Sequence, residues 1–146
     1  MFRRIKGKTK FMYYPMTTAE TPVAGSVMIM TVGSNLITAY TAGDDNSIVV
    51  GVLRHSITSA SPEYATVTPV EVEVPVEKNV LWSCNEVGTG TAAAGDVGTY
   101  ADLDDSVSID VDNSADDMFF ITQVISQTDV RGVLNMGPEC LGTIAD

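Results

Sequence analysis

The clearest alternation of apolar and polar residues in this chain lies in residues 67–77. Valines take one face and glutamates the other: Val70, Val72, Val74 and Val76 against Glu71, Glu73 and Glu77. Because successive side chains of a strand point to opposite faces, the pattern predicts a strand with one buried face. Pro69 and Pro75 lack the backbone N–H that a sheet ladder uses, so we expect this strand at a sheet edge.

Short β-rich runs separated by turn residues fill most of the remaining chain. They cover residues 27–32, 36–40, 48–53, 80–82, 97–101, 106–112, 118–125 and 130–134. Gly33-Ser34-Asn35 separates the first two runs and predicts a hairpin, while 118–125 is the most hydrophobic run and is expected at the centre of a sheet. No segment of ten or more residues has helical periodicity. We therefore expect an all-β fold, a small β-barrel or β-sandwich of about eight to nine short strands.

Charge is distributed unevenly along the 146 residues. Residues 1–10 carry +5, residues 11–146 carry −16, and the whole chain carries −11. We therefore expect an extended N-terminal arm over residues 1–19 and a single β-barrel-like domain over 20–146. An acidic body repels phosphate backbones, so a specific nucleic-acid partner is not expected.

The arm combines its cations with a dense aromatic group at 11–16, which Pro15 biases towards extended backbone. The group has two interpretations, a first strand that covers the core or an anchor in a neighbour's pocket. The cations have three: a solvated tail, a segment folded onto the acidic body, or a docking element on an acidic partner. We favour docking. The expected partner contacts are Arg3, Arg4, Lys6, Lys8, Lys10, Phe11, Tyr13 and Tyr14.

Little in the composition suits catalysis or metal binding. Two cysteines, Cys84 and Cys140, exclude a disulfide scaffold and a four-cysteine zinc site, and the single histidine, His55, stands beside no nucleophile motif. The aspartates of 102–117 lack the glycine and terminal glutamate of an EF-hand loop, so we interpret them as a solvated acidic face. No carboxylate pair for glycoside hydrolysis is singled out. We expect no enzyme activity, cofactor or metal.

Membrane attachment is not expected either. No apolar run approaches the roughly 18 to 20 residues of a membrane-spanning helix, and the N-terminus lacks the apolar stretch of a signal peptide. We expect a protein made in the cytosol.

Two parts of the chain, residues 93–126 and 40–53, contain segments that resemble a known family. The turn and strand patterns at 93–105, 107–111 and 117–126, together with 40–44 and 49–53, are similar to small capsid decoration (cement) proteins of tailed bacteriophages. The resemblance covers about residues 20–136. It implies a β-barrel on the outer surface of the virion, a homotrimer that bridges neighbouring major capsid proteins, and no catalytic residues. The basic arm is not part of this resemblance, and its contact with the shell is inferred from its charge.

A second hypothesis is a host- or glycan-binding module on the virion surface. For that function, Trp82 and Tyr100 would form the binding platform and the acidic turns an ion site.

Overall fold

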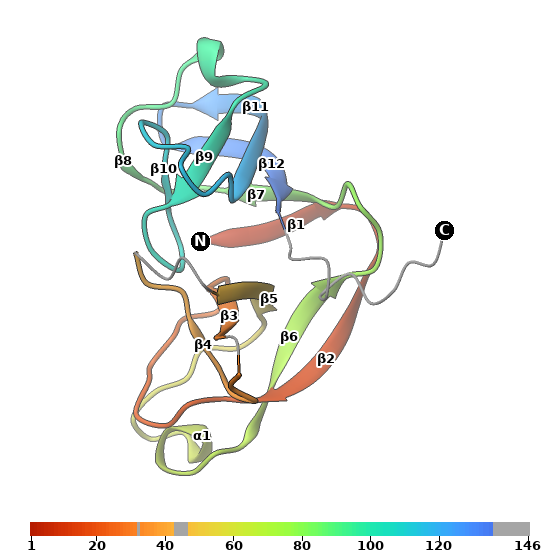
Figure 1. Cartoon of the computed structure of the whole chain (residues 1–146), viewed down its shortest axis with the longest axis vertical. Helices are drawn as coiled ribbons and strands as arrows, with labels where there is room; N and C mark the ends of the chain where they lie inside the picture. Colours follow the sequence, from red (N-terminus) through yellow and green to blue (C-terminus); the bar gives the residue numbers. More distant parts are fainter. Residues whose placement is uncertain (32, 43–46, 136–146) are drawn as a thin grey trace.

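The computed structural model describes residues 1–31, 33–42 and 47–135, and these form an almost entirely β structure (Figure 1). The strands are β1 (Phe2–Lys6), β2 (Thr9–Pro15), β3 (Val27–Thr31), β4 (Ile37–Ala39), β5 (Ser47–Leu53), β6 (Pro69–Pro75), β7 (Leu81–Cys84), β8 (Val87–Thr89), β9 (Tyr100–Leu103), β10 (Ile109–Asp110), β11 (Phe119–Ser126) and β12 (Asp129–Leu134). One short helix, α1 (Pro62–Ala65), and one 3-10 turn, η1 (Ala94–Asp96), complete the described elements.

The strands form two sheets. A seven-stranded sheet has the order β1-β7-β12-β11-β9-β10-β8 and curls into a half-barrel, and a five-stranded sheet has the order β2-β6-β5-β3-β4. Figure 1 shows the first sheet above the second, with α1 at the far end of the second. The all-β barrel or sandwich class predicted from the sequence is therefore confirmed.

Both faces of the five-stranded sheet are used for packing. On β3, Val27 and Ile29 pack with Trp82 and Phe119 of the seven-stranded sheet in the larger core. Met28, between them, belongs to a second core on the opposite face, together with apolar residues of the β5–α1 loop and the segment after β2. This division follows directly from the alternation of side chains along a strand.

The N-terminal segment is not an arm outside the domain. β1 pairs antiparallel with β7 at one edge of the seven-stranded sheet, and β2 pairs antiparallel with β6 at one edge of the five-stranded sheet (Figure 1). Phe2 is buried and its ring lies 5.7 Å from that of Phe119, edge to face. The segment was expected to be separate because its cations hide a strand in which Phe2 is buried and Arg4, although 42% exposed, reaches Glu73 of the other sheet.

β6 has the predicted buried valine face but not the predicted edge position. It lies between β2 and β5, and β2 forms the edge instead. Pro69 and Pro75 are the end residues of β6, opposite Pro15 and Thr9 of β2, so they interrupt no hydrogen bonds in the middle of the ladder. The predicted hairpin of β3 and β4 and the central position of β11 are both confirmed.

The strand count is higher than expected because β1, β2 and the three-residue strand β8 are added. The run at 106–112 supplies only β10, because the Asp105 carboxylate accepts the backbone N–H groups of Val107 and Ser108 and turns the chain there. Likewise β9 begins at Tyr100 rather than residue 97, after Gly98 takes a positive φ of 90°. Of the turn residues 41–47 between the runs at 36–40 and 48–53, residues 43–46 lie outside the described residues.

The sequence Val-x-Gly-Val-Leu occurs in one strand of each sheet, β5 and β12. A Cβ atom on Gly51 would lie 2.5 Å from the Glu73 carbonyl oxygen, and one on Gly132 would lie 2.2 Å from that of Phe120. Each glycine stands near an irregularity in strand pairing. The repeated sequence therefore reflects the same local requirement: the backbone of the adjacent strand lies too close to each glycine for a side chain to fit.

No helix in the described parts of the chain combines the length and the apolar character needed to cross a bilayer.

Candidate partner-binding surfaces

The alternation along β1 sends its two arginines in opposite directions. Arg4 faces the five-stranded sheet, where its Nε lies 2.5 Å from Oε1 of Glu73, a residue only 6% exposed. Thr9 Oγ1 donates to the same carboxylate oxygen at 2.7 Å, and Arg54 Nη1 lies 3.9 Å from Oε2. Arg4, predicted as a partner contact, therefore compensates a buried charge between the two sheets.

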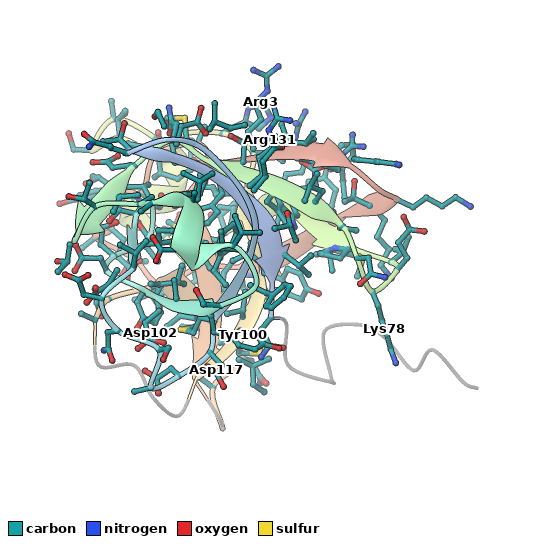
Figure 2. All side chains as sticks on the ribbon, turned by 90° about the horizontal axis from the view of Figure 1, so that it is seen from above. Arg3, Lys78, Tyr100, Asp102, Asp117 and Arg131 are labelled. Carbon is teal, nitrogen blue, oxygen red and sulfur yellow. The ribbon has the colours of Figure 1, made fainter. Side chains whose placement is uncertain are left out.

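Arg3 points outward and is exposed. It pairs across strands with Ser83 of β7, and Ser83 pairs on its other side with Arg131 of β12. We call Arg3, Ser83 and Arg131 the basic row, and Figure 2 shows its two arginines together on one side of the molecule. Arg131 Nη1 donates to Gln123 Oε1 at 3.3 Å. Within the described residues, neither arginine has a carboxylate oxygen within 4.0 Å.

The aromatic residues of β2 are divided between its two faces. Tyr14 packs against the second core, whereas Phe11 and Tyr13 remain 49% and 64% exposed on the opposite face. The Arg54 guanidinium lies 4.7 Å from the centre of the Phe11 ring, and the Tyr13 hydroxyl donates to Glu71 Oε2 at 2.6 Å. We call Phe11, Tyr13, Arg54, His55 and Glu71 the aromatic patch.

Glu71 is the electrostatic centre of the aromatic patch. The hydrogen bond from Tyr13 holds the pKa of Glu71 below its usual value, with further help from His55 and Arg54, while partial burial opposes the shift. The same bond and the nearby negative charge raise the pKa of Tyr13. His55 Nε2 lies 3.7 Å and Arg54 Nε 3.6 Å from Glu71 Oε1. The patch thus presents two exposed rings beside a fixed carboxylate.

The eight predicted contact residues therefore do not form one surface. Arg3 and Lys6 are exposed on β1, Arg4 is paired between the sheets, and Lys8 and Lys10 are exposed on and before β2. Phe11 and Tyr13 belong to the aromatic patch, and Tyr14 packs on the core. Sequence reasoning missed Arg131, Arg54 and Glu71, because only the strand register brings them beside the N-terminal residues.

The acidic segment is more structured than the solvated face that was expected. Asp102 is only 3% exposed, and its two carboxylate oxygens accept the backbone N–H groups of Ala115 and Asp116 at 3.0 and 2.9 Å. Asp105 uses one oxygen to close the turn at Val107 and Ser108. Nowhere in the described residues do three His, Cys, Asp or Glu side chains gather in a way that could hold a metal ion.

Cys84 and His55 lie in different environments. Cys84 is buried with a free thiol, and its burial raises its pKa. His55 is exposed, and its Nε2 lies 3.7 Å from Glu71 Oε1. Cys140 lies outside the described residues, so its pairing with Cys84 is not described.

Trp82 is only 1% exposed and cannot serve as the binding platform suggested by the sequence. It instead lines a cavity of about 300 Å³ between the β6–β7 loop and the ends of β9, β11 and β12. The cavity is lined by Pro75, Glu77, Lys78, Asn79, Val80, Trp82, Tyr100, Phe120, Val133, Leu134 and Asn135. Tyr100, 42% exposed, contacts Phe120 with ring centres 5.0 Å apart.

Comparisons with protein-family models, with curated proteins and with solved structures find no match to this chain.

Proposed function

We propose that this chain is a capsid decoration (cement) protein of a tailed bacteriophage. In this proposal it binds the outer surface of the head as a homotrimer, bridges neighbouring major capsid proteins and stabilises the shell. It acts by non-covalent binding and performs no catalytic step. Its place of action is the virion, after synthesis in the host cytoplasm.

The resemblance in the sequence supports this function, and the fold is compatible with it. The segment 93–126 carries most of the resemblance. It forms the turn η1 and the strands β9, β10 and β11 of the seven-stranded sheet, while 49–53 lies in β5 of the five-stranded sheet. The small all-β fold agrees with what the resemblance implies. It does not separate this function from others, because one fold can carry many functions.

The observation that carries the proposal is a set of unmatched cations on a strongly acidic protein. Arg3, Lys6, Lys8 and Lys10 are exposed, and within the described residues none of them has a carboxylate oxygen within 4.0 Å. The chain as a whole carries −11. Cations that stay separate from so many carboxylates favour an acidic partner surface, and complementary charge provides specificity and fast association.

Trimer formation rests on the resemblance alone. The hydrophobicity of 118–125 and the prolines of 69–75 add no support for it, because β11 is central and β6 is an interior strand, so both features are explained within one chain. A trimer would still suit the function, because several modest contacts in one particle give an avidity that a single contact cannot.

The direct test uses heads assembled from the major capsid protein encoded in the same genome. Purified chain is mixed with these heads, and binding is measured by co-sedimentation while light scattering gives the oligomeric state of the free protein. We expect saturable binding at local threefold positions in a particle reconstruction and a higher melting temperature of the decorated heads. Absence of saturable binding would overturn the capsid function, and a monomer both free and on the particle would overturn the trimer.

A charge variant tests the contribution of the cations. The four substitutions Arg3→Gln, Lys6→Gln, Lys8→Gln and Lys10→Gln leave the Arg4–Glu73 pair intact. We expect at least about tenfold weaker binding to heads and a flatter dependence on salt, because exposed charges are screened. Lys78→Gln, which removes a single exposed cation of the neighbouring β6–β7 loop (Figure 2), is the control and should weaken binding far less than the four substitutions do. Equal binding of both variants would refute electrostatic docking.

A further inference from the structure

The cavity beside Trp82 has the composition of a small-ligand site. Its volume of about 300 Å³ is at the lower end of the range of roughly 300–1,000 Å³ typical of ligand pockets, so it suits a single ring. Its walls are mainly apolar, with Pro75, Val80 and Leu134 among them. Apolar walls with a few polar groups at defined positions are what such sites require.

The polar groups of the cavity come from the two segments that flank it. Glu77 and Asn79 belong to the β6–β7 loop, and Asn135 follows β12. Two amides and a carboxylate offer both donors and acceptors, which matches a ligand rich in hydroxyl groups. An apolar side chain from a protein partner would leave these groups without hydrogen-bond partners, at a cost in free energy.

The aromatic pair provides a surface for the flat face of such a ligand. Tyr100 is 42% exposed and is supported from behind by its 5.0 Å contact with Phe120. A ring held in this way offers a rigid apolar surface at low entropic cost. The C–H groups on one face of a pyranose ring can pack on it while the ring hydroxyls reach the polar groups.

Trp82 supplies a second, independent observation. Its indole Nε1 is buried and has no hydrogen-bond partner among the described residues. Buried indole N–H groups usually find an acceptor, so an unmatched one in a residue that lines a cavity points to a missing partner atom. A ligand oxygen would supply it after a small shift of the neighbouring side chains, because Nε1 is closed to solvent in this structure.

From these observations we propose that the cavity of Trp82 and Tyr100 binds a pyranose ring of a surface glycan. The proposal does not rest on capsid binding, since its ligand is a glycan. Figure 2 shows Tyr100 and Lys78 on the side of the molecule away from Arg3 and Arg131. A protein bound to a partner through Arg3 and Arg131 alone would therefore keep this cavity free, whereas Lys8, whose backbone N–H donates to Glu77 at 2.7 Å, lies beside it.

The chain has a built-in reporter for this binding, because Trp82 is its only tryptophan. We would titrate the full chain with the methyl glycosides of glucose, galactose, mannose and N-acetylglucosamine and record tryptophan fluorescence. We expect at least one of them to produce a saturable change with a midpoint in the millimolar range. Tyr100→Ala should weaken that binding by at least about tenfold, and Tyr100→Phe should retain it.

Tyr13→Ala is the matched control, because Tyr13 is also an exposed tyrosine but lies in the aromatic patch. It should bind the glycoside like the unmodified chain, and melting curves should show that each variant is folded. No response to any of the four glycosides, or an equal response of Tyr100→Ala and the unmodified chain, would overturn the proposal.

Two other outcomes would also overturn it. If a chain ending at Asn135 binds a glycoside but the full chain does not, the site is closed in the protein as it exists. If the cavity binds a hydrophobic dye, loses that binding in Tyr100→Ala and ignores every glycoside, it accepts an apolar group instead of a sugar.

Discussion

Arg4 of β1 and Glu73 of β6 form an ion pair between the two sheets, with 2.5 Å between Nε and Oε1. Glu73 is buried, and its carboxylate also accepts a hydrogen bond from the Thr9 hydroxyl. Residues of β1 and β2 therefore both bind the same carboxylate of β6. A buried carboxylate without these partners would be costly. This pair makes the N-terminal segment part of the fold and separates Arg4 from the cations that are free for a partner.

Removing the carboxylate should therefore destabilise the protein. We expect Glu73→Ala to lower the free energy of unfolding by about 2–4 kcal/mol, because it leaves Arg4 without its partner and a gap between the sheets. Urea denaturation would measure the loss. Arg3→Ala, one residue from Arg4 but exposed, should change stability by less than about 0.5 kcal/mol. Equal stability of the two variants would show that the pair contributes nothing.

Deleting residues 2–14 should prevent stable folding. The deletion removes β1 and nearly all of β2, which are edge strands of the two sheets, and takes Phe2 out of the larger core. Circular dichroism and thermal melting should show loss of the cooperative transition. The four-glutamine charge variant keeps both strands and should melt as the unmodified chain does. A truncated chain that still melts cooperatively near the original temperature would contradict this assignment.

Gly132 should not tolerate a methyl group. A Cβ atom there would lie 2.2 Å from the Phe120 carbonyl oxygen and 2.5 Å from the Phe119 ring. We expect Gly132→Ala to cost at least about 1–3 kcal/mol in stability, as overpacked substitutions in cores do. Gly95→Ala is the control, because its Cβ would have no neighbour within 4 Å. Similar urea midpoints for both variants would disprove the predicted clash.

The bond between Tyr13 and Glu71 should be visible in titrations. Because the pKa of Glu71 is lowered, its stabilising contribution is present above the pKa of the unfolded carboxyl and is lost as pH falls through the lowered value. Because the pKa of Tyr13 is raised, its contribution is present below about pH 10 and is lost as pH rises through the raised value.

NMR of labelled tyrosine rings, assigned with Tyr13→Phe, would follow this titration. Glu71→Gln should move the pKa of Tyr13 back down, since it removes the charged acceptor that causes most of the shift. The ring signals of Tyr100, outside the aromatic patch, should be the same in both proteins at neutral pH. An unchanged Tyr13 titration in Glu71→Gln would rule out the bond in solution.

Stability should not depend on metals or on reduction. The described residues offer no metal cluster, and Cys84 is a buried free thiol. We expect neither EDTA nor dithiothreitol to shift the melting temperature by more than about 2 °C. A large decrease in EDTA would instead reveal a structural cation, for which the aspartates of 102–117 would be the first residues to substitute.

Local sequence patterns were sufficient for the fold class and for several individual elements. The valines of 70–74 alternate with glutamates, and this alone identified a strand with a buried face, since side-chain direction repeats every two residues. The turn at Gly33-Ser34-Asn35 identified the β3–β4 hairpin for a similarly local reason. The hydrophobicity of 118–125 identified a central strand, although β11 pairs with β9 only at Phe119 and Phe120 and most of its second half is exposed.

Only the tertiary structure decided which strands lie at the edges and which charges are free. Glu73 and Arg4 are 69 positions apart, so their pairing depends on how two sheets pack and not on any local pattern. The same is true of Trp82, whose type suggested a binding platform but whose place between the sheets buries it. The alternation along a strand determines which side chains share a face. Whether that face lies against solvent, the core or an opposite charge depends on residues distant in sequence.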